Sequence, residues 1–189
     1  LANSGSNNVF GYMIATTGAL TTISGSPFSG VTAPSAVTVS ANGSFVYVTN
    51  QGGANSVSAF TVNNTTGELT PAAGSPFATG TTLSAVTIAP NGNYLYVANE
   101  GGNVSAYTIT TGTGALTPVA GSPFTAGANP AAITIEPNGG YLYVANGGGN
   151  VSAYAIAPGT GALTPLNGSL GNPFPTGTTP SGIATPGRP

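Results

Sequence analysis

The sequence predicts an all-β fold, a β-propeller of about four antiparallel blades with four strands and roughly 48 residues each. Three observations predict it: a tetrapeptide that returns at regular intervals, an Asn-Gly pair within the intervals, and the lack of a 3.6-residue hydrophobic period. Four antiparallel strands repeated in tandem are typical of propeller blades. A β-solenoid is the main alternative, but its turns are usually shorter than these units.

The repeat is marked by the tetrapeptide Gly-Ser-Pro-Phe. It occurs at residues 25–28, 74–77 and 121–124, and the variant Gly-Asn-Pro-Phe occupies residues 171–174. The steps between successive copies are 49, 47 and 50 residues, a regularity that chance matches do not produce. The chain therefore reads as copies of one unit rather than as one irregular domain.

Each unit contains four short runs of β-forming residues. An Asn-Gly pair separates the first two runs at residues 42–43, 91–92 and 138–139, and it is a strong hairpin signal because both residues tolerate positive φ. A Gly-rich turn precedes the third run, such as residues 57–62, and a Thr-Gly turn precedes the fourth. In the second run at residues 94–97 both faces are apolar, which indicates a sheet stacked between neighbours.

The units divide the single repeat domain, residues 1–189, into three complete blades and one blade shared between the two ends. The expected pieces are a partial blade (end of a second strand, then third and fourth strands) at 1–28, blades at 34–77, 83–124 and 130–174, and a first strand at 180–185. Open sheet edges invite pairing. We therefore expect the ends to close a small ring, two chains to combine, or the chain to be part of a longer polypeptide, with assembly or a missing remainder favoured.

The charge content limits the possible partners. Charged residues make up only 2% of the chain, and Lys, Asp, His and Cys are absent. With a single Arg the chain cannot neutralise several phosphates, which argues against nucleic-acid binding. No apolar run approaches the roughly 20 residues that a membrane span requires. A neutral surface of Gly, Ser, Thr and Asn indicates an extracellular or cell-surface protein.

Several segments together carry a resemblance to a known family. Residues 91–99 and 138–146, with the recurring Val-Ser-Ala-Tyr, Thr-Gly-Ala-Leu-Thr and Gly-Ser-Pro-Phe, resemble the lactonase-like (6-phosphogluconolactonase-like) seven-bladed β-propeller family. The resemblance covers nearly the whole chain and implies propeller blades, here a partial set. It also implies a lactonase-type hydrolase, whose central site would use ionisable side chains.

Residue types argue against catalysis by this chain. Without His, Cys or Asp it cannot form a Ser-His-Asp or Cys-His arrangement or a His/Cys zinc site. The repeat pattern places Glu68 and Glu136 on one face of the ring and Glu100 on the other, each as an exposed turn residue. We therefore expect no catalytic residue, no metal site and no cofactor.

The turn after each second strand is the best candidate binding site. An Asn recurs there while the following residue varies, and the expected binding residues are Asn50, Gln51, Asn99, Glu100 and Asn146. A fixed Asn also fits a local bond from its side chain to the turn backbone. The varying neighbour fits a loop residue that lines a shared face.

These observations lead to one expected function and two alternatives. The expectation is a non-enzymatic extracellular scaffold or binding module that self-associates through blade edges, in a homo-oligomer or a filament. Low charge favours such packing, because little repulsion opposes it. The alternatives are a lactonase-like hydrolase, which the family resemblance implies, and a module that binds neutral glycans through Asn, Gln and Tyr.

Overall fold

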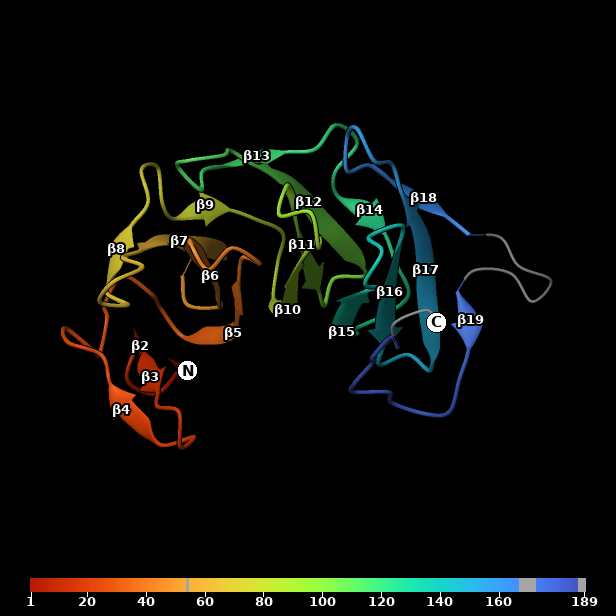
Figure 1. Ribbon diagram of the computed structural model, residues 1–189. Coiled ribbons are helices and arrows are strands. Elements are labelled where there is room, and N and C mark those ends of the chain that lie inside the picture. Colours follow the sequence, from red (N-terminus) through yellow and green to blue (C-terminus); the bar gives the residue numbers. More distant parts are fainter. Residues whose placement is uncertain (54, 167–172, 187–189) are drawn as a thin grey trace.

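The computed structural model describes residues 1–53, 55–166 and 173–186, and these residues form short antiparallel strands without a helix (Figure 1). The expected all-β fold is confirmed. The N-terminal part consists of two small sheets, β1-β2 and β3-β4. Their strands are β1 (Ala2–Asn3), β2 (Asn8–Val9), β3 (Tyr12–Ile14) and β4 (Leu20–Thr22).

Three larger sheets follow, and they share one topology. In each, four strands lie in chain order and a short fifth strand pairs with the third. The first contains β5 (Pro34–Val39), β6 (Phe45–Asn50), β7 (Ser56–Val62), β8 (Leu69–Pro71) and β9 (Phe77–Ala78). The second contains β10 (Leu83–Ile88), β11 (Tyr94–Asn99), β12 (Asn103–Ile109), β13 (Leu116–Pro118) and β14 (Phe124–Thr125). The third contains β15 (Pro130–Ile135), β16 (Tyr141–Asn146), β17 (Asn150–Ile156), β18 (Leu163–Pro165) and β19 (Phe174–Pro175).

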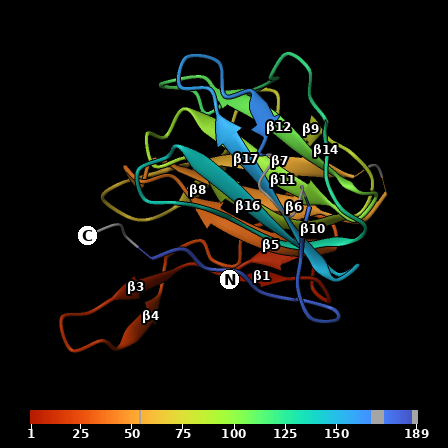
Figure 2. The ribbon, with the colours of Figure 1, turned by 90° about the vertical axis from the view of Figure 1, so that its right-hand side faces the viewer.

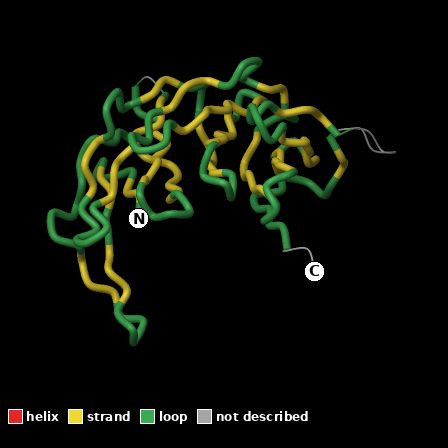
Figure 3. Tube along the Cα trace, turned by 45° about the horizontal axis from the view of Figure 1, so that its top comes forward, coloured by secondary structure: helices red, strands yellow, loops and turns green. Residues whose placement is uncertain are grey.

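The sheets are arranged as blades around an open arc. Figure 1 shows the first strands β5, β10 and β15 on the concave side and the outer strands β8, β13 and β18 on the rim. The tube in Figure 3 shows the two chain ends on separate arms of this arc. In Figure 2 the β3-β4 hairpin extends away from the blades. The arrangement is a partial propeller.

In the first two large sheets the outer strand is interrupted by the Gly-Ser-Pro-Phe motif. β8 pairs with the end of β7 at Val62↔Leu69, whereas β9 pairs with its beginning at Val57↔Phe77. Between them the Ser75 hydroxyl accepts a hydrogen bond from the Ala59 amide at 2.9 Å. The serine thus replaces the missing main-chain partner, and no buried amide is left unpaired there.

The Asn-Gly pairs form hairpin turns, but only the glycine of each pair adopts the positive φ that the sequence suggests for both residues. The glycines have positive φ, 71° at Gly43 and 74° at Gly92. The asparagines use their side chains instead, since Asn42 Oδ1 accepts the Ser44 amide at 3.1 Å and Asn91 Oδ1 accepts the Asn93 amide at 2.9 Å. The loop is longer than a two-residue turn, so only its glycine needs the left-handed conformation.

Aromatic side chains fill the spaces between blades, as the repeat pattern predicts. Tyr47 and Tyr96, each from the second strand of its sheet, are fully buried. Their hydroxyls donate to carbonyls of the next blade, Tyr47 to Gly114 at 3.0 Å and Tyr96 to Gly161 at 2.9 Å. These bonds satisfy the phenol groups inside otherwise apolar cores and fix the spacing between adjacent sheets.

The C-terminal segment runs beside the third blade without joining a sheet. Residues 180–185, the expected first strand of a further blade, do not form a strand. The Thr185 hydroxyl donates to the Ile135 carbonyl at 3.2 Å, so the segment passes along the end of β15. Figure 1 shows the N-terminal strands on the opposite arm of the arc. The two ends therefore do not build a common blade in this structure.

Candidate functional site

One face of the arc is formed by the turns after the second and fourth strands, and we call it the loop face. These turns are tied together within each blade by main-chain bonds, from the Gln51 amide to Ala33 at 3.1 Å and from the Glu100 amide to Thr82 at 2.8 Å. Ala33 and Thr82 have positive φ values of 44° and 51°. Such backbone is uncommon outside glycine and needs support from its surroundings. The loop face is therefore a braced surface.

The recurring asparagines lie beneath this face and are buried. Asn50 Nδ2 donates to Ser58 Oγ at 2.9 Å, and Asn50 Oδ1 accepts the Thr32 amide at 3.1 Å. Asn99 and Asn146 are fully buried, and each donates to the serine at the equivalent position of its third strand at 2.9 Å. Their Oδ1 atoms have no hydrogen-bond partner among the described residues. The asparagines thus hold the turns in place below the surface.

The residues that follow these asparagines lie at the surface. Gln51 and Glu100 are both exposed. Gln51 reaches across to the next blade, where its Nε2 donates to the Leu83 carbonyl at 2.6 Å. Leu83 pairs with Asn99, the residue just before Glu100. The structure therefore brings the amide of Gln51 and the carboxylate-bearing turn of Glu100 to one location between two blades.

Hydroxyl groups also lie at this location, on the concave side of the arc. The Ser35 hydroxyl also donates to the Leu83 carbonyl, at 2.8 Å, and interacts with Thr49 Oγ1 at 2.8 Å. One blade further, Ser84 donates to the Pro130 carbonyl at 2.6 Å. We define Ser35, Gln51, Thr82 and Glu100 as the Gln51–Glu100 site. It offers amide, hydroxyl and carboxylate groups, the set that hydrogen-bonds polyhydroxy compounds.

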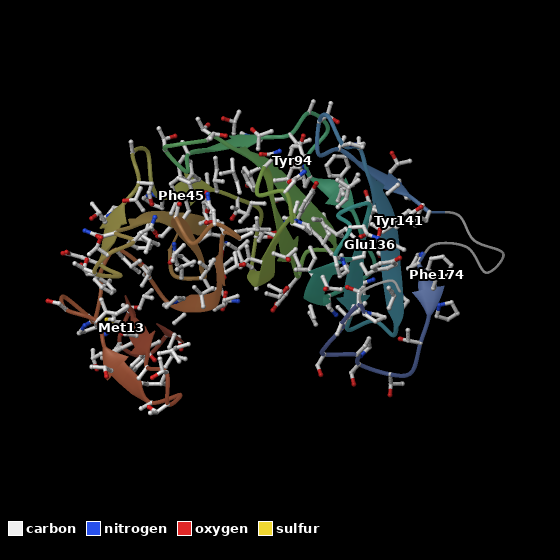
Figure 4. All side chains as sticks on the ribbon, viewed as in Figure 1. Met13, Phe45, Tyr94, Glu136, Tyr141 and Phe174 are labelled. Carbon is white, nitrogen blue, oxygen red and sulfur yellow. The ribbon has the colours of Figure 1, made fainter. Side chains whose placement is uncertain are left out.

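The other two carboxylates lie elsewhere. Glu68 is exposed in the turn before β8, as expected. Glu136 was expected to be an exposed turn residue, but only 7% of it is exposed. It lines a cavity of about 340 Å³ together with Tyr143 and residues 183–186. Figure 4 shows Glu136 near β16. The sequence could not reveal this, because the covering segment comes from the end of the chain.

Among the described residues, no group of three or more His, Cys, Asp or Glu side chains could hold a metal ion. In the same part of the chain, no helix has the length and apolar character needed to cross a membrane.

The fold and the loop face define a propeller assembled from repeated blades. A family model described as "Lactonase, 7-bladed beta-propeller" matches residues 6–77 and 70–178. The chain therefore belongs to the lactonase family of seven-bladed β-propellers. None of the curated proteins matches this sequence.

Solved structures share the fold. A putative 6-phosphogluconolactonase from Bacteroides uniformis is 21% identical with a TM-score of 0.81, over 98% of this chain and 57% of that one. A second, from Bacteroides fragilis, is 25% identical with a TM-score of 0.65, over 82% of this chain and 42% of that one. The periplasmic gluconolactonase of Pseudomonas aeruginosa is 20% identical with a TM-score of 0.75, over 93% and 50%. The chain thus spans about half the length of these proteins.

These comparisons correct the expected function. The expectation of a non-enzymatic scaffold or binding module is wrong, because the family and several similar structures are named for lactonases. Self-association through blade edges stays a prediction. The expectation relied on the missing His, Asp and Cys. The missing residue types concern this chain alone, and the chain corresponds to about half of the related propellers. The family resemblance seen in the sequence is confirmed.

Proposed function

We propose that this chain supplies blades of a lactonase-type hydrolase that binds and opens a sugar lactone on the loop face. The match to the lactonase family model over residues 6–77 and 70–178 carries this proposal. The names of the similar structures, two putative 6-phosphogluconolactonases and a gluconolactonase, support the substrate class. Binding residues on loops of a rigid scaffold are common in proteins.

The Gln51–Glu100 site is the part of the chain best suited to this reaction. Hydrolysis adds water to the ester carbonyl carbon, breaks the ring C–O bond and leaves a carboxylic acid and a hydroxyl group. In this proposal the Glu100 carboxylate accepts the proton of the attacking water and returns it to the departing ring oxygen. Gln51 and Ser35 bind and orient the hydroxyl groups of the sugar, since both carry donors and acceptors.

The Gln51–Glu100 site favours an uncharged lactone over a phosphorylated one. Recognition of a phosphate usually relies on Arg or Lys, and none of the four residues that define the site is of either type. An uncharged gluconolactone requires only the amide, hydroxyl and carboxylate groups that the site offers.

The direct test is hydrolysis of glucono-δ-lactone by the purified chain, measured above the spontaneous rate. Glu100→Gln should reduce the enzymatic rate about a hundredfold or more, the usual contribution of a general base. Glu68→Gln is the matched control, because Glu68 is an exposed carboxylate outside the site. The proposal fails if the chain does not accelerate hydrolysis, or if both variants retain the same rate.

A further inference from the structure

A pocket of about 160 Å³ lies between the first and second large sheets, on the face of the arc opposite the loop face. It is formed by three turns: the β5-β6 hairpin, the β10-β11 hairpin and the turn between β12 and β13. These turns lie at the other ends of the strands from the turns of the loop face, so the pocket is separate from the Gln51–Glu100 site. Both sheets contain a full set of five strands. We call this space the hairpin pocket.

The lining of the hairpin pocket combines uncharged polar side chains with two apolar ones. Phe45 and Ile109 are each only 7% exposed and supply the apolar part. Of the described residues that line the pocket, none carries a charge. The polar side chains are amides and hydroxyls from all three turns: Ser40, Asn42, Asn91, Asn93 and Thr111. Apolar side chains together with a few polar groups in fixed positions are typical of small-molecule sites.

Two of the lining asparagines are held in position by their own turns. Asn42 Oδ1 accepts the Ser40 hydroxyl at 2.7 Å and the Ser44 amide at 3.1 Å. Asn91 Oδ1 accepts the Asn93 amide at 2.9 Å. Neither Nδ2 atom has a hydrogen bond to another described residue. Because a side-chain amide is planar, holding its oxygen also fixes the direction of its nitrogen, so each asparagine offers a pre-positioned donor at the pocket.

At the junction of the second and third large sheets, an aromatic hydroxyl occupies the corresponding location. Tyr94 stands at the position of Phe45, and Figure 4 shows the two residues in successive blades. The Tyr94 hydroxyl donates to the Pro158 carbonyl at 3.1 Å, in the turn between β17 and β18. At the hairpin pocket Thr111 stands at the position of Pro158, and Phe45 has no hydroxyl to extend towards it. The space that the Tyr94 hydroxyl fills is therefore open beside Phe45.

A proline ring also contributes to closing that second junction. Pro90 lies against Gly139, where an added Cβ would be 3.5 Å from Pro90 Cδ. Ala41 stands at the position of Pro90, and Gly92 stands at that of Gly139. A Cβ added at Gly92 would meet no atom within 4 Å beyond its chain neighbours. The hairpin pocket is therefore a consequence of Ala41 and Phe45, the two residues that differ from their counterparts in the next blade.

We propose that the hairpin pocket binds the six-membered ring of an uncharged sugar. Its volume of about 160 Å³ matches one such ring, since a cavity of about 150 Å³ accommodates a benzene ring. The C–H groups of a sugar ring fit the apolar part at Phe45 and Ile109, and its hydroxyls fit the amides and hydroxyls of the three turns. The lining disfavours sugar acids and sugar phosphates, because it provides no cationic side chain for an anionic group. This binding does not depend on lactonase activity.

The test is an amide NMR titration of the full chain with the methyl glycosides of glucose, galactose and mannose. These compounds contain no lactone carbonyl, so their binding is measured independently of hydrolysis. We expect at least one of them to give saturable shifts at Gly92, Asn93 and Gly112, three residues of the pocket. A trisaccharide of the sugar that binds distinguishes two sources of the ring. Equal or tighter binding of the trisaccharide indicates the end of a glycan, and weaker binding indicates a free sugar.

Two changes of the protein locate the binding. The double variant Ala41→Pro/Phe45→Tyr gives the first hairpin the residues that close the next junction, and it should abolish the shifts. Asn93→Ala removes an exposed lining amide and should weaken binding about tenfold, the effect of one lost hydrogen bond. Asn64→Ala is the matched control, because Asn64 is an exposed asparagine in the turn between β7 and β8, outside the pocket. Amide spectra of each variant establish that it is folded.

Three results overturn the proposal. The first is the absence of shifts at the hairpin pocket with all three glycosides up to their solubility limits, including the case in which shifts are confined to the loop face. The second is a folded double variant that binds the glycoside as tightly as the unaltered chain does. The third is equal affinity of Asn93→Ala and Asn64→Ala for the glycoside.

Discussion

Replacing Tyr96 by phenylalanine should destabilise the junction between the second and third large sheets. Tyr96 is fully buried, and its hydroxyl donates to the Gly161 carbonyl at 2.9 Å. The substitution keeps the ring but leaves a buried carbonyl without its partner, which costs about 1–3 kcal/mol. For a chain of this length, each kcal/mol lowers the melting temperature by roughly 2–4 °C.

Tyr143 provides a control at the equivalent position of the third sheet. It is half-buried, and its hydroxyl has no hydrogen bond within the described residues. Tyr143→Phe should therefore change the free energy of unfolding by less than about 0.5 kcal/mol, as expected for a substitution away from any such feature.

The assay is urea unfolding of both variants and of the unaltered chain, followed by tyrosine fluorescence and circular dichroism. We expect a lower midpoint for Tyr96→Phe with an unchanged slope, because the surface exposed on unfolding is the same. If the two variants are equally stable, the bond between blades does not contribute as argued. That result would refute the role assigned to the second-strand tyrosines.

Three further predictions concern stability. Gly161→Ala should lower the free energy of unfolding by about 1–3 kcal/mol more than Gly112→Ala. Both glycines have positive φ, but only at Gly161 would a Cβ overlap the Tyr94 ring. Thermal melting compares the two variants, and equal losses of stability would contradict the packing. Ser122→Ala should lower the free energy of unfolding by about 1–3 kcal/mol, since the Ala106 amide loses its acceptor at 2.9 Å. Ser24→Ala, at an exposed serine, serves as the control in the same melting experiments. A loss of stability no larger than that of the control would count against the bond. Burial raises the pKa of Tyr47, Tyr96, Tyr107 and Tyr154. The unfolded chain therefore ionises first, and the free energy of unfolding should fall above pH of about 10 by about 1.4 kcal/mol per pH unit and tyrosine. Urea midpoints that stay constant between pH 9 and 11 would disagree.

Much of the fold could be predicted because its determinants are local and repeated. Asn-Gly pairs, Gly-rich turns and runs such as Tyr94–Asn99 recur at a fixed spacing, and each specifies a strand or a turn by itself. The interruption of the fourth strands could not be predicted. It depends on a bond between Ser75, in the turn between β8 and β9, and Ala59 of β7, which are far apart in the sequence.

The candidate site could be predicted only in part from the sequence. The recurring asparagines were recognised as turn residues, but their burial depends on serines of the third strand such as Ser58 and Ser105. The proximity of Gln51 to Glu100 depends on the contact of Gln51 with Leu83 in another blade. Residues that are far apart in the sequence meet there only because adjacent sheets stack, and no local pattern encodes that contact.

The functional expectation failed for a different physical reason. A missing residue type excludes a reaction only when the chain contains the whole site. This chain covers 57% of one similar propeller and 50% of another, and the concave side of a propeller is shared among all of its blades. The composition of a subset of blades therefore does not decide whether the family's chemistry is present.

The location of the proposed site can be tested most directly by an amide NMR titration with gluconolactam, an uncharged analogue of the lactone that is not hydrolysed. We expect saturable shifts at Gln51, Thr82 and Glu100, and the loss of these shifts in Glu100→Gln. Shifts confined to the cavity around Glu136 and Tyr143, or no shifts up to the solubility limit of the lactam, would contradict a lactone site on the loop face.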